Sequence, residues 1–167
     1  LDPGVTLHSA GLRDEDAVLA VPALPVSVYA NSSAFAAVRE DGSVATWGEP
    51  TWGGDSNHVR EQLARGVQRI FGTRSAFAAV KGDGSIVTWG ELSWGGDSSA
   101  VRADLQSDVV HVFATDYAFA AVKVGSAVVT WGDPEGGGDC SRVSSQLRSE
   151  VQHIYATDSA FAALKVD

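Results

Sequence analysis

The sequence contains no methionine, a single cysteine and no long run of apolar residues. One cysteine, Cys140, excludes an internal disulfide framework. No stretch approaches the roughly 18 apolar residues that a membrane-spanning helix needs, so we predict no membrane span. The first residues lack the cationic and apolar regions of a signal peptide. Because an initiator methionine is also absent, we expect a processed or partial chain.

Positive charge is scarce as well. The chain carries 12 Lys and Arg against 21 Asp and Glu, a net charge of −9. Proteins that bind a nucleic-acid backbone need clustered cations. The charge balance therefore argues against a nucleic-acid partner, and its simplest interpretation is solubility.

Motifs of catalysis and cofactor binding are missing too. There is no Walker loop, no His-Glu-x-x-His, no cysteine pair and no triad pattern. His111 and His153 share one register of a repeat whose other members are Ser27 and Arg69. Such a mixed polar set is typical of a solvated strand position. We predict no catalytic residue, no cofactor and no metal ion.

What the sequence does contain is a repeat with a period of 42 residues, visible in the spacing of Phe35 and Phe77. A period of this length indicates stacked supersecondary units, which bury their apolar faces against one another. The recurring positions are Phe35, Phe77, Phe119 and Phe161 in Ala-Phe-Ala-Ala, Trp47, Trp89 and Trp131 in Thr-Trp-Gly, and Asp55, Asp97 and Asp139 after Gly-Gly.

Within one unit the pattern predicts three short strands and one short helix. In the second unit the strands are expected at 67–72, 75–81 and 85–89, and Asp83-Gly84 is a hairpin signal. A helix of about ten residues is expected after them, because apolar residues recur at Val101, Leu105 and Val109. Its N-cap is expected at 97–99. The fold class is therefore mainly β with one short helix per repeat.

The strands are apolar on both faces, which is typical of sheets covered on both sides. The pattern Asp-Gly-Ser-Ile-x-Thr-Trp-Gly (83–90), followed by a Gly-rich turn and then Ala-Phe-Ala-Ala-Val-Lys (118–123), resembles the RCC1-type β-propeller repeat. It is closer to short-repeat relatives, which include a propeller-shaped inhibitor of β-lactamase and long tandem arrays in unicellular algae. The resemblance covers 26–167 and implies an arc of three to four propeller blades whose loops bind proteins. A β-β-β-α solenoid is the alternative.

The resemblance has one clear departure. The Gly-Gln-Leu-Gly of the archetypal repeat is replaced here by Gly-Gly-Asp-Ser and the expected helix. We therefore do not carry over the chromatin binding or nucleotide exchange known in that family.

The expected domain organisation is an N-terminal segment followed by the repeats. Residues 1–25 resemble the last third of a ubiquitin-like domain, or supply a closing strand at 16–21 before a Pro-containing linker. Asp167 occupies the hairpin position of Asp41, so the fourth unit is expected to lack its return strand. The repeats are expected at approximately 26–67, 68–109, 110–151 and 152–167 (incomplete).

Trp52 and Trp94 are the candidate partner-binding residues, since they lie on the loops before the expected helices and the third unit has Gly136 there. The alternative is packing against a neighbouring helix. Asp55, Asp97 and Asp139 are interpreted as caps, because a metal site needs several converging oxygen ligands.

The predicted function is a non-catalytic repeat scaffold for protein–protein interaction, either a fragment or a subunit of a larger assembly, with self-association through open sheet edges as one route. One alternative is an accessory structural subunit of an algal, including a photosynthetic, complex. A further alternative is a ligand-binding or enzymatic propeller.

Overall fold

A computed structural model describes residues 27–166 of the chain. The expectations for residues 1–25, namely a ubiquitin-like remnant or a closing strand, lie outside the described residues. Among the residues described, no helix is long and apolar enough to cross a membrane.

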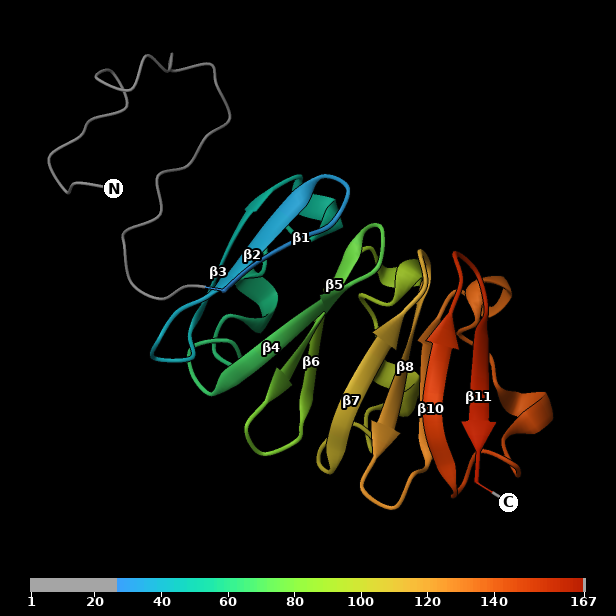
Figure 1. Cartoon of the computed structure of the whole chain (residues 1–167). Coiled ribbons are helices and arrows are strands. Elements are labelled where there is room, and N and C mark those ends of the chain that lie inside the picture. Colours follow the sequence, from blue (N-terminus) through green and yellow to red (C-terminus); the bar gives the residue numbers. More distant parts are fainter. Residues whose placement is uncertain (1–26, 167) are drawn as a thin grey trace, which may run out of the picture.

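The described part of the chain is mainly β, with four small antiparallel sheets in sequence order (Figure 1). Three sheets have three strands and the last has two. The sheets are β1 (Ser27–Ala30), β2 (Ala34–Val38) and β3 (Val44–Gly48); β4 (Val67–Gly72), β5 (Ala76–Lys81) and β6 (Ile86–Gly90); β7 (Val109–Ala114), β8 (Ala118–Lys123) and β9 (Val128–Gly132); and β10 (Val151–Ala156) with β11 (Phe161–Lys165). The three strands predicted for the second unit are confirmed to within one residue at each end.

The same cross-strand pair occurs near one end of the ladder between the second and third strands of each complete sheet. Phe77 of β5 lies opposite Trp89 of β6, and their rings stack with centroids 5.3 Å apart. The equivalent pairs have centroids 5.4 and 5.2 Å apart in the first and third sheets. Stacked aromatic pairs stabilise a sheet beyond the area that they bury. The regular spacing of Phe and Trp along the chain therefore produces the same aromatic pair in each complete sheet.

The prediction of one α-helix per repeat is wrong. Each of the first three repeats instead has two three-residue 3₁₀ segments followed by turns: η2 (Pro50–Trp52) and η3 (Asn57–Val59), η4 (Leu92–Trp94) and η5 (Ser99–Val101), and η6 (Pro134–Gly136) and η7 (Ser141–Val143). In the second repeat the backbone bonds of this segment join residues three apart, as from Asp104 N–H to Val101 O and from Leu105 N–H to Arg102 O. The left-handed backbone of Asp108, with φ 67°, ends these turns before β7. The carbonyl of Leu105 accepts from Ile86 N–H at 2.9 Å, which ties the last turn to the start of β6.

Contacts between units are made by a Gly-Gly turn against the aromatic pair of the next unit. Trp89 Nε1 donates to Gly53 O at 3.0 Å, and Trp131 Nε1 donates to Gly95 O at 3.1 Å. A Cβ on Gly53 would meet the Phe77 ring at 2.6 Å, so only glycine fits this turn. The turn of one blade thus closes over the Phe–Trp pair of the following blade.

Backbone bonds between hairpins also join the blades. Ser32 N–H donates to Arg74 O, Arg74 N–H to Asp116 O, and Asp116 N–H to Asp158 O, at 3.2, 2.8 and 2.9 Å. Figure 1 shows the result as four blades lying side by side, with β4, β7 and β10 on the same side of the arc. The first strand of each sheet therefore contributes to one continuous surface.

The two ends of the described arc are less buried than its middle. Phe77 and Phe119 are fully buried, whereas Phe35 in the first sheet is 42% exposed. Phe35 has no Gly-Gly turn of an earlier unit over it among the described residues. At the other end β11 pairs only with β10, and most of its side chains are exposed.

Candidate functional site

The two loop tryptophans lie on turns whose backbone is fixed by side chains of the same unit. Asn31 Nδ2 donates to Trp52 O at 2.7 Å, and Thr73 Oγ1 donates to Trp94 O at 3.0 Å. Both indole side chains are half-buried. The Trp94 ring also meets Tyr117 of the next unit edge-on, with centroids 4.9 Å apart. Each tryptophan is therefore held in place while part of it remains in contact with solvent.

The aspartates after Gly-Gly bond to the backbone two residues ahead. Asp55, Asp97 and Asp139 each accept, through Oδ1, an N–H bond of 2.8 Å. In Asp97 the bonds from Ser99 hold the pKa of the carboxyl below its ordinary value, and in Asp139 those from Ser141 do the same. These carboxylates open the 3₁₀ turns η3, η5 and η7.

Asp41 and Asp83 shape the first two hairpins in a similar way. Ser85 donates to Asp83 Oδ1 from its hydroxyl at 2.6 Å and from its backbone at 3.0 Å. The hydroxyl bond is the larger cause of the lowered pKa of Asp83. In Asp41 the pKa is likewise lowered by Ser43. All four lowered pKa values belong to carboxylates that hold turns.

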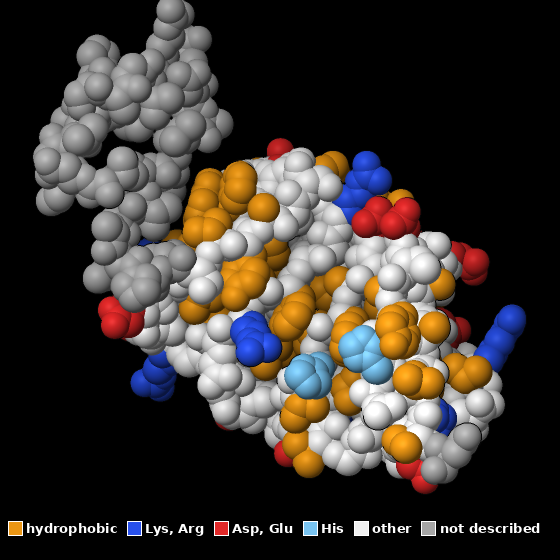
Figure 2. All heavy atoms as spheres, viewed as in Figure 1, with side chains coloured by type: hydrophobic (Ala, Val, Ile, Leu, Met, Phe, Trp, Pro, Cys, Tyr) orange, Lys and Arg blue, Asp and Glu red, His pale blue; other side chains and the backbone are white. Residues whose placement is uncertain are grey.

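A strip of exposed and half-buried rings runs across the first strands of three neighbouring blades. We name it the inner strip and define it as Phe71, His111, Phe113, His153 and Tyr155. The Phe113 and His153 rings meet edge-on with centroids 5.4 Å apart, and His153 and Tyr155 are 4.6 Å apart. Tyr155 is 59% exposed. Figure 2 shows histidine side chains among hydrophobic ones on this face, over β7 and β10.

The inner strip was missed as a site, although the sequence holds a signal for it. The 42-residue period places an aromatic residue at Tyr29, Phe71, Phe113 and Tyr155. His111 and His153 were interpreted only as solvated strand positions. Both are exposed, and their aromatic neighbours two residues further on share the same strand face.

Between residues 27 and 166 no three His, Cys, Asp or Glu side chains lie close enough to hold a metal ion. The hairpin ends of the blades line a shallow hollow of about 580 Å³, with Arg74, Asp116 and Asp158 at its wall. Its charges are mixed and its walls are mainly turn backbone.

No family model matches this sequence, and no curated protein matches it. Solved structures do. Human WBSCR16 aligns with a TM-score of 0.56 and 14% identity over 86% of this chain and 45% of its own. Prp20p from Saccharomyces cerevisiae, described with its binding to Gsp1p and histones, aligns at 0.55 and 14% over 84% of this chain and 42% of its own.

Yeast RCC1 (Prp20) bound to Kap60 aligns with a TM-score of 0.56 and 13% identity, over 89% of this chain and 43% of its own. The chain therefore has an RCC1-like β-propeller fold. It spans less than half the length of each of these structures. At this identity the likeness establishes the fold alone.

Proposed function

We propose that this chain is a non-catalytic repeat scaffold that binds another protein within a larger assembly. Residues 26–167 form the scaffold in this proposal, and the repeat boundaries remain those suggested by the 42-residue period. The observation that carries the proposal is the inner strip, in which Tyr155 and both histidines are exposed beside the half-buried rings of Phe71 and Phe113. Exposed apolar patches of this kind mark interaction surfaces.

The chemistry of the inner strip fits a protein partner. Aromatic side chains are enriched at interface hot spots, and each lies on a strand that cannot rearrange freely. The imidazoles of His111 and His153 add hydrogen-bonding groups beside the rings. The solved neighbours support the same class of function, since their descriptions name protein partners for yeast Prp20p.

Trp52 and Trp94 supply a second surface in this proposal. Leu92, on the same turn as Trp94, is 65% exposed. Fixed backbones lower the entropy cost of binding through these loops. The inner strip and the loop tryptophans can therefore be tested separately.

The test is the mass of the native particle that contains the chain, compared with 17.4 kDa for the chain alone. We expect a much larger mass, reduced by the double substitution Phe113→Ser and Tyr155→Ser, or by Trp52→Ser and Trp94→Ser. The matched control is Val124→Ser, which changes a 67% exposed apolar residue on a hairpin. A native mass of one chain, or a mass that neither double substitution changes, would contradict the proposal.

A further inference from the structure

One end of the blades carries a surface that is built from the same two turns in each repeat. We name it the loop face and define it as the turns 31–33, 73–75, 115–117 and 157–159 together with the 3₁₀ turns 49–52, 91–94 and 133–136. Thr73 Oγ1 donates to Trp94 O at 3.0 Å, and Glu91 N–H donates to Ser75 O at 2.9 Å, which joins the two kinds of turn. Figure 1 shows the turns after β1, β4, β7 and β10 at one end of the blades. Blades join one another at their sides, so the loop face does not depend on how many blades the arc has.

Two turns of the loop face share the motif Glu-x-Thr/Ser-Trp. In η4 the Ser93 hydroxyl donates to Glu91 Oε1 at 3.0 Å, and Trp94 N–H donates to Glu91 O at 3.2 Å. The same two bonds occur in the turn 49–52, at 3.1 Å each. Because residues three apart lie above one another in a 3₁₀ turn, the carboxylate and the indole of each motif share one side of the turn.

The third blade supplies its aromatic ring from a different position. Gly136 stands where the first two blades have Trp52 and Trp94. Tyr117 stands where the second blade has the fully buried Ser75. A Cβ on Gly136 would lie 2.5 Å from the Cβ of Tyr117, so no side chain fits at 136 beside this tyrosine. The two exchanges therefore belong together, and Tyr117 takes the place of a third loop tryptophan.

The rings of Trp94 and Tyr117 meet across the boundary between the second and third blades. Their planes are nearly perpendicular, at 84°, and both side chains are half-buried. Leu92, on the same turn as Trp94, is exposed. The face of a Trp or Tyr ring attracts a Lys ammonium or an Arg guanidinium, because the ring carries negative charge density there. The row of Trp52, Trp94 and Tyr117 is therefore suited to cationic side chains with long apolar stems.

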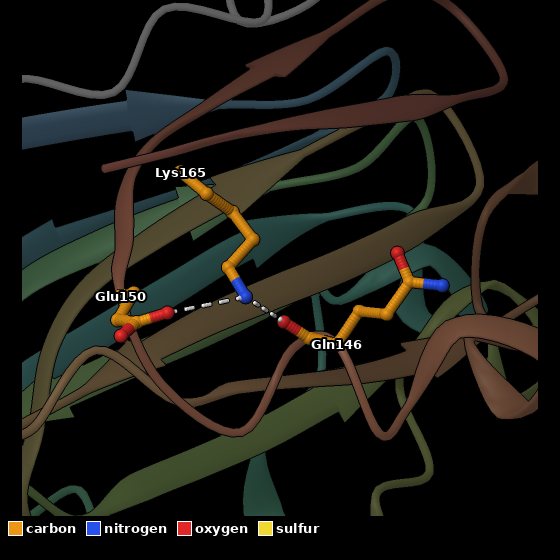
Figure 3. A network of polar contacts seen from close by, with 3 residues as sticks. All are labelled: Gln146, Glu150 and Lys165. Carbon is orange, nitrogen blue, oxygen red and sulfur yellow. Dashed lines mark hydrogen bonds and ion pairs between the residues drawn. The ribbon is translucent and has the colours of Figure 1, made fainter. Parts of the chain in front are cut away.

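The charge of the loop face is mostly of one sign. Its acidic residues are Glu49, Glu91, Asp116, Asp133, Glu135 and Asp158, and its one basic residue is Arg74. Within residues 27–166 the one ion pair closer than 4 Å joins Lys165 Nζ to Glu150 Oε2, at 3.6 Å. It lies at the opposite end of the fourth blade from 157–159, where Lys165 also donates to Gln146 O (Figure 3). The carboxylates of the loop face therefore have no cation of the described chain at that distance.

We propose that the loop face binds an extended protein segment rich in arginine and lysine. The stems and cationic heads of its side chains lie against Trp52, Trp94 and Tyr117, and the carboxylates beside these rings pair with the heads. The inference rests on the proposed function and deepens it, because it names the chemistry of the partner at the loop tryptophans. It also adds Tyr117 to the partner-binding residues.

Other occupants fit less well. An acidic segment or a nucleic acid would bring charge of the same sign to these carboxylates. A second copy of this chain has 12 Lys and Arg against 21 Asp and Glu, so it would also meet the loop face with an excess of like charge. Charge complementarity therefore selects a basic partner.

The test uses the 167-residue chain and a fluorescein-labelled peptide in which arginine and glycine alternate. The matched control peptide has citrulline in place of each arginine, which keeps the shape of the side chain and removes its charge. We expect saturable binding of the arginine peptide, measured by anisotropy, and binding of the citrulline peptide that is at least about tenfold weaker. Added salt should weaken the arginine peptide, because it screens exposed charges.

Two charge-matched variants of the protein locate the binding. Glu49→Gln combined with Glu91→Gln removes two carboxylates of the loop face and keeps a hydrogen-bond acceptor at each position. It should weaken binding of the arginine peptide about three- to tenfold, as expected for the loss of two exposed charge pairs. Glu40→Gln combined with Glu61→Gln removes the same charge at exposed positions outside the loop face. This control should change binding by less than about twofold, because salt screens charges that lie far from the peptide.

Tyr117 has its own pair of variants. Tyr117→Phe keeps the ring and should bind the arginine peptide as the unchanged chain does. Tyr117→Ser, which introduces the residue found at this position in the second blade, should weaken binding about threefold or more through loss of the cation–π contact. The two peptides and the glutamine variants leave the aromatic packing intact, so they decide the matter even if Tyr117→Ser unfolds.

Equal binding of the arginine and citrulline peptides would overturn the inference. Equal weakening by the two pairs of glutamine substitutions would overturn it as well, since attraction to the net charge of −9 would then account for the binding. Tighter binding of a peptide of alternating glutamate and glycine would assign the loop face to an acidic partner. A dimer of the chain that Glu49→Gln combined with Glu91→Gln dissociates would assign it to a second copy.

The native particle separates this inference from the proposed function. A mass that falls with Trp52→Ser and Trp94→Ser, but not with Glu49→Gln and Glu91→Gln, would leave the proposed function standing and contradict the basic segment. A mass that falls with both pairs supports the two together. Phe113→Ser combined with Tyr155→Ser should not affect the arginine peptide, so failure of the inner strip leaves the loop face untouched.

Discussion

Gly53, Gly95 and Gly137 are the residues on which contact between blades depends. Each has a φ near 100°, and a Cβ at each would lie within 2.8 Å of a phenylalanine ring. Their carbonyls at 53 and 95 accept the indole N–H of the next blade. The glycine therefore serves the backbone turn, the ring contact and the hydrogen bond at once.

The phenylalanines allow a comparison of one substitution in two environments. Phe77→Ala removes a fully buried ring and should cost about 3–5 kcal/mol. Phe35→Ala removes a ring that is 42% exposed and should cost less than about 2 kcal/mol. Urea unfolding of both variants checks the difference. Equal losses would mean that the ring in the first blade is covered in solution.

The glycines of Gly-Gly could be predicted as turn residues, but their role between blades could not. The contact joins Gly53 to Trp89, which are 36 residues apart. Nothing in the local pattern distinguishes such a contact from an ordinary tight turn. The same kind of contact relates Gly137 to Phe161 in the last blade.

At the scale of elements, the strands could be predicted and the helix could not. The Ala-Phe-Ala-Ala and Thr-Trp-Gly segments are bounded by hairpin signals, and apolar residues on both faces identify them as buried strands. The spacing of Val101, Leu105 and Val109 is compatible with a helix and equally compatible with a series of turns. In the structure the backbone bonds join residues three apart, as from Leu105 N–H to Arg102 O, so the segment forms successive turns.

The third hairpin departs from the first two. The Asp-Gly-Ser signal of the first two hairpins is absent from the third, where Ser126 takes the place of Gly42 and Gly84. All three residues have a positive φ, of 66°, 74° and 75° respectively. The strands β8 and β9 remain paired around it. The bond from Val151 N–H to Ser126 O is 3.4 Å long, against 3.0 Å for Val109 N–H to Gly84 O.

Ser126→Gly should therefore stabilise the protein by about 0.5–1 kcal/mol. The left-handed backbone costs roughly 1–2 kcal/mol for a residue with a Cβ, and the greater entropy of unfolded glycine offsets part of the gain. The reciprocal control, Gly84→Ser, should destabilise, because a Cβ there would lie 2.8 Å from Asp108 N. Both changes are measured from the midpoints of urea unfolding, compared between variants whose unfolding free energy depends on urea concentration with the same slope. A lower midpoint for Ser126→Gly would show that the serine has a compensating contact.

At the scale of the whole molecule, stability is distributed along the arc. The second and third blades each have a neighbour on both sides, and their Phe–Trp pairs are buried. The first blade has a half-buried Trp47, and the last has only two strands within the described residues. In repeat proteins the stability of a unit is roughly its own contribution plus that of its interfaces. A unit with one interface should therefore open before a unit with two.

Native-state hydrogen exchange should reveal this gradient in the free chain. We expect the amides of β5, β6, β8 and β9 to be the most protected, and those of β3 and β11 to exchange fastest, through local opening at each end. Uniform protection across all four sheets would mean that the arc opens as one cooperative unit.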